Sequence, residues 1–393
     1  MSEWKCYNLN EISSLSNGIN FDKSAYTSGV KLIGVSDFKD RIHPDYDSLQ
    51  EVDSKVVKSG DYLEKGDIVF VRSNGNKELV GRCMMIDRDI PVTYSGFCIK
   101  LRLNDKKIFD PVFFNYLFKT RQFKKSMTGT AVGANIQNLS QSRLGSCEVN
   151  VPDVETQKEI ASILSRYDSL IENYQKQIKL LEEAAQRLYK EWFVDLHFPG
   201  HENTKIVDGV PEGWEKKRLV DLVDVQYGYA FDGRLFNSNG EGMPILRIRN
   251  IPDGITSDYT TEEASPNYIV HDGDIVVGMD GIFHINSWNG GDAYLVQRAC
   301  SFRPKEESTR GFIFQAIQEP IKYFEQTLVG ATVAHLGKKH IDSIELTVPA
   351  NKDLYIPFQE GFKQRQSLLS QIRLLTEARD RLLPKLMSGE IAV

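Results

Sequence analysis

The chain has 393 residues, a net charge of −6 and a hydrophobic fraction of 41%. This length suits two or three domains, each large enough to bury a core. The charge excludes a uniformly basic surface, although basic residues gathered on one face would still suit DNA. With no apolar signal core at the start and no run of membrane length, the sequence predicts a cytoplasmic protein.

The cysteines predict buried free thiols. There are five of them, an odd number, and they are scattered without a CxxC pair. This pattern favours reduced side chains in the cytoplasm over disulfides or a metal site. The five residues are Cys6, Cys83, Cys98, Cys147 and Cys300.

Residues 1–152 predict a strand-rich globular domain. Apolar runs with β-branched members occur at 31–38, 65–75 and 96–103, and Gly, Asn and Asp interrupt them. Such short runs are typical of strands. The segment from Pro111 to Met127 predicts a helix, and the run that ends at Pro152 closes the domain.

Residues 153–193 predict one long helix whose apolar residues recur at alternating steps of four and three. This heptad pattern is typical of a helix that pairs with another helix. Polar residues fill the outer positions, as at Gln175, Lys176, Glu182 and Glu183. At ~1.5 Å per residue the helix would reach about 55 Å, too long for burial inside a small domain. The alternative is an amphipathic helix lying on one large domain. The seam consists of Ile160, Leu164, Tyr167, Ile171, Tyr174, Ile178, Leu181, Ala185, Leu188 and Trp192.

The second half of the chain predicts a linker, a second strand-rich domain and a second long helix. Pro and Gly mark residues 194–213 as the linker. Residues 214–350 form the domain, with strands expected at 242–251, 273–279 and 293–302 and a helix at 311–326. Residues 351–393 contain the second helix, which Pro384 should kink or end. Its seam consists of Leu368, Ile372, Leu375, Arg379, Leu382 and Leu386.

The two halves are copies of one another. Ile178–Leu188 matches Ile372–Leu382 with seven identities at an offset of 194 residues. Leu139–Pro152 matches Leu336–Pro349, and Tyr62–Phe70 resembles Tyr268–Val277. A period near 200 residues exceeds that of solenoid repeats, so each copy is a domain plus a helix. The fold class is therefore α+β, a tandem pseudo-repeat of two strand-rich domains, each followed by a long helix that pairs with the other.

Catalytic motifs are absent from the sequence. It holds no GxGxxG, GxxxxGK[ST], HExxH or GxSxG pattern. His335 and His340 lie close together but lack further ligand-type neighbours, so no metal site is predicted. Glu215, Lys216 and Lys217 resemble a nuclease motif only faintly and lie in a connector. These absences favour a recognition or scaffold protein over an enzyme.

The sequence VPDVETQKEIASIL at the start of the first long helix resembles that of the DNA specificity subunit of Type I restriction–modification systems. Its signature residues are Pro152, Gln157, Ile160 and Leu164. The second copy departs from the pattern, because five extra residues separate Pro349 from Gln359. The resemblance rests on this text and on the repeat architecture, which covers essentially the whole chain.

The resemblance implies a non-catalytic subunit that reads double-stranded DNA. Each globular domain would be a target recognition domain for one half of a split, asymmetric sequence. The helices would pair as an antiparallel coiled coil, hold the domains a fixed distance apart and dock two copies of a DNA adenine methylation subunit. Those partners would bind S-adenosylmethionine, and this chain would carry no cofactor. ATP-dependent restriction subunits would be further partners, and the DNA target itself is not predicted.

Candidate DNA-binding residues follow from the side chains that bind base edges and phosphates. A loop after a strand offers Arg72, Ser73, Asn74, Asn76, Lys77 and Arg82, with a solvated hairpin as the alternative. A basic cluster holds Lys119, Arg121, Lys124 and Lys125, with a solvated helix face as the alternative. Asn135 and Gln137 lie in a glycine-bearing segment that packing would explain equally well. The second domain offers Arg247 and Arg249 on one strand face, Asn250, Asp280, Gln297, Arg298, Lys338 and Lys339.

Two other functions compete with this interpretation. One is an adaptor protein whose helices form a dimerisation arm and whose domains bind other proteins. The other is the recognition module of a single-chain restriction–methylation enzyme. An adaptor would bind duplex DNA no better than its charge predicts, whereas a specificity subunit would select a sequence.

Overall fold

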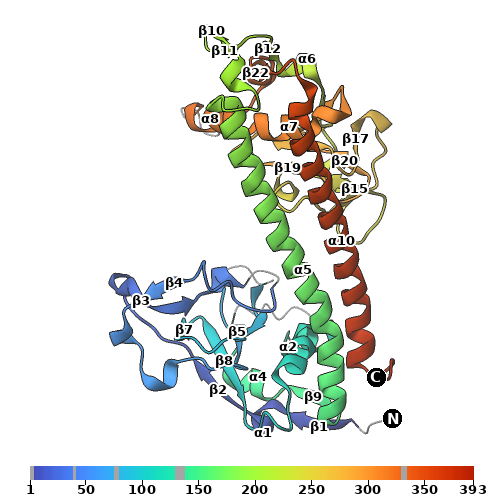
Figure 1. Ribbon diagram of the computed structural model, residues 1–393. Coiled ribbons are helices and arrows are strands. Elements are labelled where there is room, and N and C mark those ends of the chain that lie inside the picture. The colour runs from blue at the N-terminus through green and yellow to red at the C-terminus, as the bar shows by residue number, and fades with distance from the viewer. Residues whose placement is uncertain (1–3, 39–40, 75–78, 129–137, 329–333) are drawn as a thin grey trace. The chain divides into compact units, whose positions relative to one another are not determined.

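The computed structural model describes residues 4–38, 41–74, 79–128, 138–328 and 334–393. The chain divides into two compact units. Unit 1 comprises Met1–Ile171 and Leu375–Val393, and unit 2 comprises Glu172–Leu374. The division passes through both long helices, so each unit holds one globular part together with a segment of each helix (Figure 1).

The globular part of unit 1 is built from short strands and short helices. Its strands are β1 (Lys5–Asn8), β2 (Ser13–Asn17), β3 (Tyr26–Ile33), β4 (Gln50–Val52), β5 (Ile68–Val71), β6 (Cys83–Met85), β7 (Val92–Tyr94), β8 (Cys98–Leu103) and β9 (Glu148–Val151). Its helices are α1 (Leu9–Ile12), α2 (Pro111–Lys119), α3 (Arg121–Thr128) and α4 (Gln141–Gly145). A four-stranded sheet has the order β2-β8-β5-β6, a three-stranded sheet has the order β4-β3-β7, and β1 pairs with β9.

Unit 2 repeats this plan with additional short strands. Its strands are β10 (Ile206–Val207), β11 (Val210–Pro211), β12 (Glu215–Arg218), β13 (Val223–Tyr227), β14 (Phe236–Asn237), β15 (Met243–Leu246), β16 (Tyr259–Thr260), β17 (Ile269–Val270), β18 (Ile275–Gly278), β19 (Ile285–Ser287), β20 (Ala293–Leu295), β21 (Ala299–Pro304) and β22 (Glu345–Val348). Its short helices are α6 (Leu219–Leu222), α7 (Arg310–Ala316), α8 (Gln318–Thr327) and α9 (Lys338–Asp342). The order β13-β21-β18-β19 corresponds to β2-β8-β5-β6, and β12 pairs with β22 as β1 pairs with β9. The predicted duplication is therefore present in the topology.

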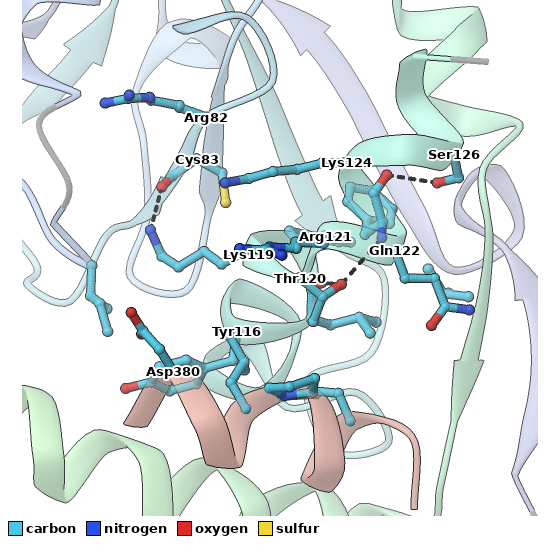
Figure 2. A pocket seen from close by; sticks show the side chains of 18 of the residues that line it. Arg82, Cys83, Tyr116, Lys119, Thr120, Arg121, Gln122, Lys124, Ser126 and Asp380 are labelled. Carbon is cyan, nitrogen blue, oxygen red and sulfur yellow. Dashed lines mark hydrogen bonds between the residues drawn. The ribbon is translucent and has the colours of Figure 1, made fainter. Parts of the chain in front are cut away.

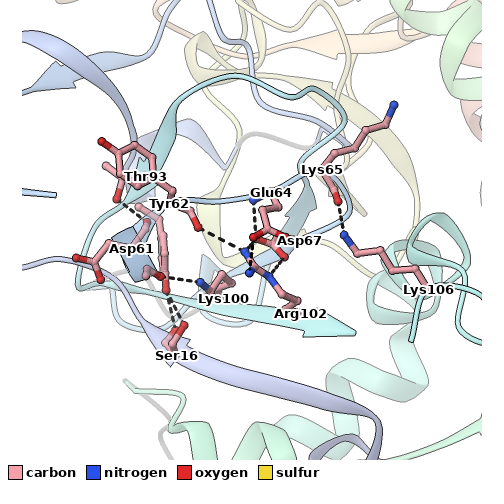
Figure 3. A network of polar contacts seen from close by, with 12 residues as sticks. Ser16, Asp61, Tyr62, Glu64, Lys65, Asp67, Thr93, Lys100, Arg102 and Lys106 are labelled. Atoms are coloured by element: carbon pink, nitrogen blue, oxygen red, sulfur yellow. Dashed lines mark hydrogen bonds and ion pairs between the residues drawn. The ribbon is translucent and has the colours of Figure 1, made fainter. Parts of the chain in front are cut away.

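An ion pair between neighbouring strands of the four-stranded sheet explains the repeated Gly-Asp sequence. Asp67 is fully buried and accepts hydrogen bonds from two nitrogens of Arg102, each at 2.7 Å (Figure 3). Asp274 accepts from Arg303 at 2.9 and 3.0 Å in unit 2. The glycine before each aspartate has a φ near +90°, a conformation that side chains other than glycine rarely adopt. The repeated pair is thus a structural element of both sheets.

Each long helix is tied to its own globular part by a glutamine. The side chain of Gln157 accepts a hydrogen bond from the Asp110 amide (2.9 Å) at the start of α2. Gln359 accepts one from the Gly311 amide (3.0 Å) at the start of α7. Both glutamines are buried. A buried amide N–H without a partner is costly, so each glutamine fixes the short helix against the long one.

The two long helices are α5 (Val154–Tyr189) and α10 (Ile356–Met387). A π-helical turn at Lys190–Val194 follows α5, so the regular helix ends before the predicted Trp192. The five extra residues before Gln359 are accommodated largely by a 3-10 turn at Lys352–Tyr355, after which α10 begins. Pro384 lies inside the last turn of α10, and the helix ends at Met387.

Several sequence-based expectations are wrong at the level of single residues. Cys6 is exposed, although the other four cysteines are buried free thiols as predicted. Glu182 is not an outer residue, because it bonds to Arg365 of α10. The predicted linker includes a β10–β11 hairpin, and its Phe198 is buried against Trp214 at 4.6 Å between ring centroids. These aromatic contacts attach the segment to unit 2.

The predicted strand that carried Arg247 and Arg249 ends at Leu246. Residues Ile248–Asn250 form a 3-10 turn instead, because the Asn250 side chain accepts a hydrogen bond from the Arg247 amide at 2.9 Å. Arg247 lies over the Phe236 ring, and Arg249 forms an ion pair with Asp258 at 2.6 Å. The two arginines therefore do not share a strand face.

Candidate nucleic-acid interface

The carboxyl end of β5 forms a compact loop junction in unit 1. The Arg72 amide donates to the Phe97 carbonyl (2.8 Å), and the Arg72 carbonyl accepts from the Leu139 amide (2.7 Å). Ser73 forms a β-bridge with Asn138. Three segments far apart in the sequence thus meet at one end of the four-stranded sheet. We call this junction reading end 1.

The carboxyl end of β18 forms the same junction in unit 2. The Met279 amide donates to the Arg298 carbonyl (2.8 Å), and the Met279 carbonyl accepts from the Leu336 amide (2.7 Å). Asp280 forms a β-bridge with His335. We call this junction reading end 2. The matched hydrogen bonds make Ser73 equivalent to Asp280, and Phe97 equivalent to Arg298.

The side chains at the two reading ends differ in chemistry. Reading end 1 presents Phe97, which is 61% exposed although it is a large apolar residue. Reading end 2 presents Arg298, whose side chain is 60% exposed and whose backbone has a positive φ of 71°. A positive φ is strained for a residue with a side chain, and such strain concentrates at functional positions. A common backbone frame therefore carries side chains of different chemistry at the two ends.

Asp280 holds the charged groups of reading end 2 together. It pairs with the Arg298 guanidinium and accepts from His335 Nδ1 at 2.6 Å. Partial burial alone would raise the pKa of Asp280, but the hydrogen bonds from His335 and Arg298 outweigh it and lower the pKa below its usual range. The carboxylate is thus ionised at neutral pH and fixes the direction of the arginine. An arginine held in this way suits bidentate contact with a guanine edge.

A cationic cleft of about 990 Å³ lies beside α2 and α3 in unit 1 (Figure 2). Lys119 spans one wall, where its Nζ donates to the carbonyls of Arg41 and Cys83 at 3.0 Å each. Arg121 and Lys124 are exposed on α3. Glu148 and Asp380 are the acidic side chains of the lining. The cationic lining consists of Arg41, Arg82, Lys119, Arg121, Lys124 and Arg379.

Unit 2 has no comparable charge in the corresponding part of its described residues. A smaller cleft of about 260 Å³ is lined by amides such as Gln315 and Gln318 and by the Arg365–Glu182 pair. Helix α8 carries Glu319 and Glu325, whereas the sequence of α3 has no acidic residue. Phosphate groups would therefore be attracted more strongly to the cleft of unit 1.

The structure brings some predicted DNA-binding residues together and separates others. Arg72 and Ser73 belong to reading end 1, and Arg298 belongs to reading end 2. Asn74 and Gln297 are their neighbours in the sequence. Arg82, Arg121 and Lys124 line the cleft instead, and Lys125 also lies on α3. Lys338 pairs with Asp342 within α9 at 2.8 Å, next to Lys339. Asn76, Lys77, Asn135 and Gln137 lie outside the described residues.

Sequence reasoning missed three residues of the reading ends, Phe97, Asn138 and His335. A signal existed, because the repeated Gly-Asp text fixes the alignment of β5 with β18. Residues directly after β5 and β18 therefore occupy equivalent positions and were candidates for the same function in the two units. Their contact partners, however, come from loops without recognisable repeated text.

The long helices contact one another within each unit. Asp168 of α5 binds Arg379 of α10 at 2.5 Å in unit 1, and Glu182 of α5 binds Arg365 of α10 at 2.6 Å in unit 2. The predicted seam residues Ile160, Leu164, Ile171, Ile178, Leu368 and Leu386 are buried. Tyr167, Tyr174, Leu181, Leu188, Trp192, Ile372, Leu375 and Leu382 are partly buried.

The outer faces of the two helices carry matching exposed residues. Leu180 on α5 is 64% exposed, and its repeat equivalent Leu374 on α10 is 61% exposed. An exposed ion pair follows each leucine one turn later. These pairs are Glu183–Arg187 at 3.8 Å and Glu377–Arg381 at 4.0 Å. We call each group of leucine and ion pair an outer patch.

Other kinds of site find no support in the described residues. There, no group of three or more His, Cys, Asp or Glu side chains is arranged to hold a metal ion. None of the helices in the same ranges has the length and apolar character needed to cross a membrane.

Comparisons with known proteins agree with this geometry. A family model described as the Type I restriction modification DNA specificity domain matches residues 1–183 and 211–365. The specificity subunit of the Type I restriction enzyme MjaIX from Methanocaldococcus jannaschii is 28% identical over 295 residues, covering 71% of this chain and 68% of that protein. The HindI specificity subunit from Haemophilus influenzae is 24% identical, with 100% of both chains covered.

A solved structure is similar to this chain over nearly its whole length. It is the S subunit of a Type I restriction-modification system from M. genitalium, with a TM-score of 0.58 and 18% sequence identity. The match covers 98% of this chain and 96% of that chain. At this identity the similarity supports the fold, including its mixed helix and strand content and its repeat of two parts.

Proposed function

We propose, because this chain belongs to the family of Type I restriction modification DNA specificity domains, that it selects a split, asymmetric DNA sequence for a Type I restriction–modification complex. As a specificity subunit it is a recognition component without catalysis of its own. Family membership also sets aside the adaptor alternative. The observation that carries the finer proposal is the pair of reading ends, which share one backbone frame but present different side chains.

The two reading ends would each read one half of the target. Because their backbone hydrogen bonds match, they would approach DNA in a similar way. Because Phe97 and Arg72 stand in one end and Arg298, Asp280 and His335 in the other, they would select different bases. An apolar ring suits a thymine methyl group, whereas an arginine suits guanine. The target would therefore be asymmetric.

Long helices α5 and α10 would form an antiparallel coiled coil that sets the gap between the half-sites. The heptad seam and the helix–helix contacts within each unit support this proposal. The outer patches would dock two copies of one methylation subunit. Their residues match between the repeats although they are exposed and take no part in the seam, so a shared binding partner accounts for the match. The partners would bind S-adenosylmethionine and methylate adenine, and ATP-dependent restriction subunits would join them.

Methylation-site sequencing tests this function directly. The chain would be reconstituted with its methylation subunit and S-adenosylmethionine, and random-sequence DNA would be modified and sequenced. We expect one asymmetric motif with two specified parts and an unspecified gap. Methylation without a sequence motif, or a motif with a single continuous part, would contradict the proposal.

Arg298→Met should relax one base pair in the half-site read by unit 2. Loss of a bidentate arginine contact costs about 1–3 kcal/mol of discrimination at one position. The same sequencing would show several bases accepted where the wild type accepts guanine, with the other half-site unchanged. Arg234→Met is a matched control, because Arg234 pairs with Asp232 on an exposed turn. An unchanged motif in the Arg298 variant would remove Arg298 from the reading surface.

Arg121→Gln combined with Lys124→Gln should weaken binding to all DNA sequences alike. A plot of log K against log salt concentration has a negative slope, and each lost phosphate contact reduces its magnitude by about 0.9. The slope of the double variant should therefore be smaller in magnitude by about 1.8. Fluorescence anisotropy with target and random duplexes at several salt concentrations measures this slope. Lys23→Gln with Lys55→Gln removes the same charge from exposed positions outside the cleft. Equal slopes in the two double variants would show that the cleft does not bind phosphate.

A further inference from the structure

One stretch of shared sequence in the two long helices raises a question of partner choice. The texts Ile178–Leu188 of α5 and Ile372–Leu382 of α10 share seven identities. Because this stretch is shared, pairing of each helix with the same helix of a second copy competes with pairing between α5 and α10. Heptad helices choose between such partners through polar residues at or beside the seam. The contacts between α5 and α10 contain such residues.

One of these contacts is a buried node in unit 1. Asp168 of α5 is buried and accepts hydrogen bonds from Arg379 of α10 and from the Tyr116 hydroxyl of α2, both at 2.5 Å. Arg379 also bonds to Asp380 on its own helix. Burial alone would lower the pKa of Arg379, but the nearby Asp168 outweighs it and raises the pKa. The guanidinium is therefore charged and paired.

A second node, built around a buried arginine, lies in unit 2. Arg365 of α10 is buried and donates to Glu182 of α5 at 2.6 Å. It also donates to the Ser287 hydroxyl and, at 2.8 Å, to Asn286, both on β19. The step from Asp168 forward to Glu182 equals the step from Arg379 back to Arg365. Both pairs thus fit a single antiparallel register of the two helices.

The charges are divided between the helices by sign. Both acids belong to α5 and both arginines belong to α10. Because both helices are continuous, the offset of 194 residues can be extended from the matched stretch along each helix. Ile171 of α5 then takes the helical position of Arg365, and Ala185 takes that of Arg379. The counterparts of Asp168 and Glu182 on α10 are Phe362 and Thr376. At these positions, therefore, α5 has no basic residue to pair with its own acids, and α10 has no acidic residue to pair with its own arginines.

Self-pairing in the same register would leave these charges without partners. In an α5–α5 pair, Asp168 would face Ala185 and Glu182 would face Ile171 of the second copy. In an α10–α10 pair, the arginines would face Phe362 and Thr376. Removal of one partner from a buried ion pair is strongly destabilising, because the remaining charge stays buried and unpaired. Each self-paired arrangement would contain four such unpaired charges, and the penalty would be smallest at Glu182, which is partly exposed.

We propose that the Asp168–Arg379 and Glu182–Arg365 pairs form a charge code that directs α5 to α10 and rejects the same helix of a second copy. Tyr116, Ser287 and Asn286 assist both members of the code, because hydroxyl and amide groups can serve as donors or as acceptors. This proposal concerns helix pairing alone and does not depend on DNA recognition.

Charge reversal in the full chain tests the code. The acid variant carries Arg365→Glu and Arg379→Glu, the base variant carries Asp168→Arg and Glu182→Arg, and the reversed variant carries all four changes. We expect the melting temperature of the acid and base variants to fall by about 10 °C or more. The reversed variant should recover most of that loss and remain monomeric, because complementarity within the chain is restored.

A mixture of the acid and base variants tests whether the charges select the partner helix or only stabilise the fold. The acid and base variants, unfolded and refolded together, should form a species of twice the mass, since each α5 then complements the α10 of the other chain. Arg187→Glu with Arg381→Glu is the control for the acid variant, because it makes the same charge change at exposed positions; its melting temperature should stay within about 2 °C of the wild type. A reversed variant no more stable than the acid variant, or a mixture without the double-mass species, would overturn the proposal.

Discussion

Leu180→Glu combined with Leu374→Glu is expected to abolish methylation by the reconstituted complex while leaving the chain folded. Both leucines are more than half exposed at equivalent places on the two helices, and neither belongs to the helix seam. A carboxylate placed in an apolar contact should cost at least about 2 kcal/mol at each site, or roughly 30-fold in affinity. The measurement is methyl transfer to target DNA together with the melting temperature of the isolated chain.

The single variants should each remove one copy of the methylation subunit. Native mass spectrometry would then show one bound copy in place of two, because each outer patch would dock its partner independently. Leu170→Glu is the matched control, since Leu170 is exposed on α5 but its repeat position on α10 is Gln364. Loss of both copies from one single variant would mean that the patches form one composite site. Full binding by the double variant would place docking elsewhere.

The architecture was predictable because it is encoded in repeated local patterns. The heptad spacing predicted both long helices to within a few residues, and shared sequence in the helices and around the Gly-Asp pairs predicted the duplication. The structure supplies the physical reason for this shared text. Gln157 and Gln359 accept hydrogen bonds from equivalent backbone amides, and Asp67 and Asp274 form ion pairs with equivalent arginines. Residues with such local and obligatory roles leave a signal in the sequence.

The composition of the reading ends was less predictable, because each end combines segments that are distant in the sequence. Asp280, Arg298 and His335 meet only when β18, the β20–β21 turn and the segment before α9 come together. Arg247 and Arg249 show the opposite error. Their alternation suggested a strand face, but the Asn250 side chain captures the Arg247 amide and turns the chain. Hydrogen bonds from a side chain to nearby backbone can override such alternation.

The charge code could not be predicted from the sequence for a related reason. Glu182 follows the seam residue Leu181, and in the sequence it is indistinguishable from a solvent-exposed residue of a long helix. Arg379 was predicted to lie in the seam, but the sequence did not indicate which residue it would pair with. Asp168 lies next to Arg379, and Glu182 next to Arg365, only when the two helices pair in the antiparallel register. A pattern within one helix states which face is apolar, but it does not state which residue of another helix will lie opposite. Pairing specificity is therefore a property of two segments together.

An insertion that is matched in the two helices should lengthen the gap in the DNA target. Gln175 lies midway between Asp168 and Glu182, and Ile372 lies midway between Arg379 and Arg365. Four residues added after each of these positions would extend both helices by about 6 Å. At ~3.4 Å per base pair, sequencing of methylated sites should show a gap longer by one or two base pairs. Both half-site sequences should be unchanged, because neither reading end is altered.

The unmatched insertion provides the critical contrast. Four residues added to α5 alone would displace Glu182 by about one turn relative to Arg365 whenever Asp168 remains with Arg379. The Glu182–Arg365 pair must then break, which is destabilising because the buried Arg365 guanidinium loses its carboxylate partner. We therefore expect a lower melting temperature and loss of methylation from the α5 variant, and a working complex with a longer gap from the matched variant. If the matched insertion changed the half-site sequences as well as the gap, the two reading ends would not act independently, and a single composite DNA-binding surface would have to replace the proposed pair.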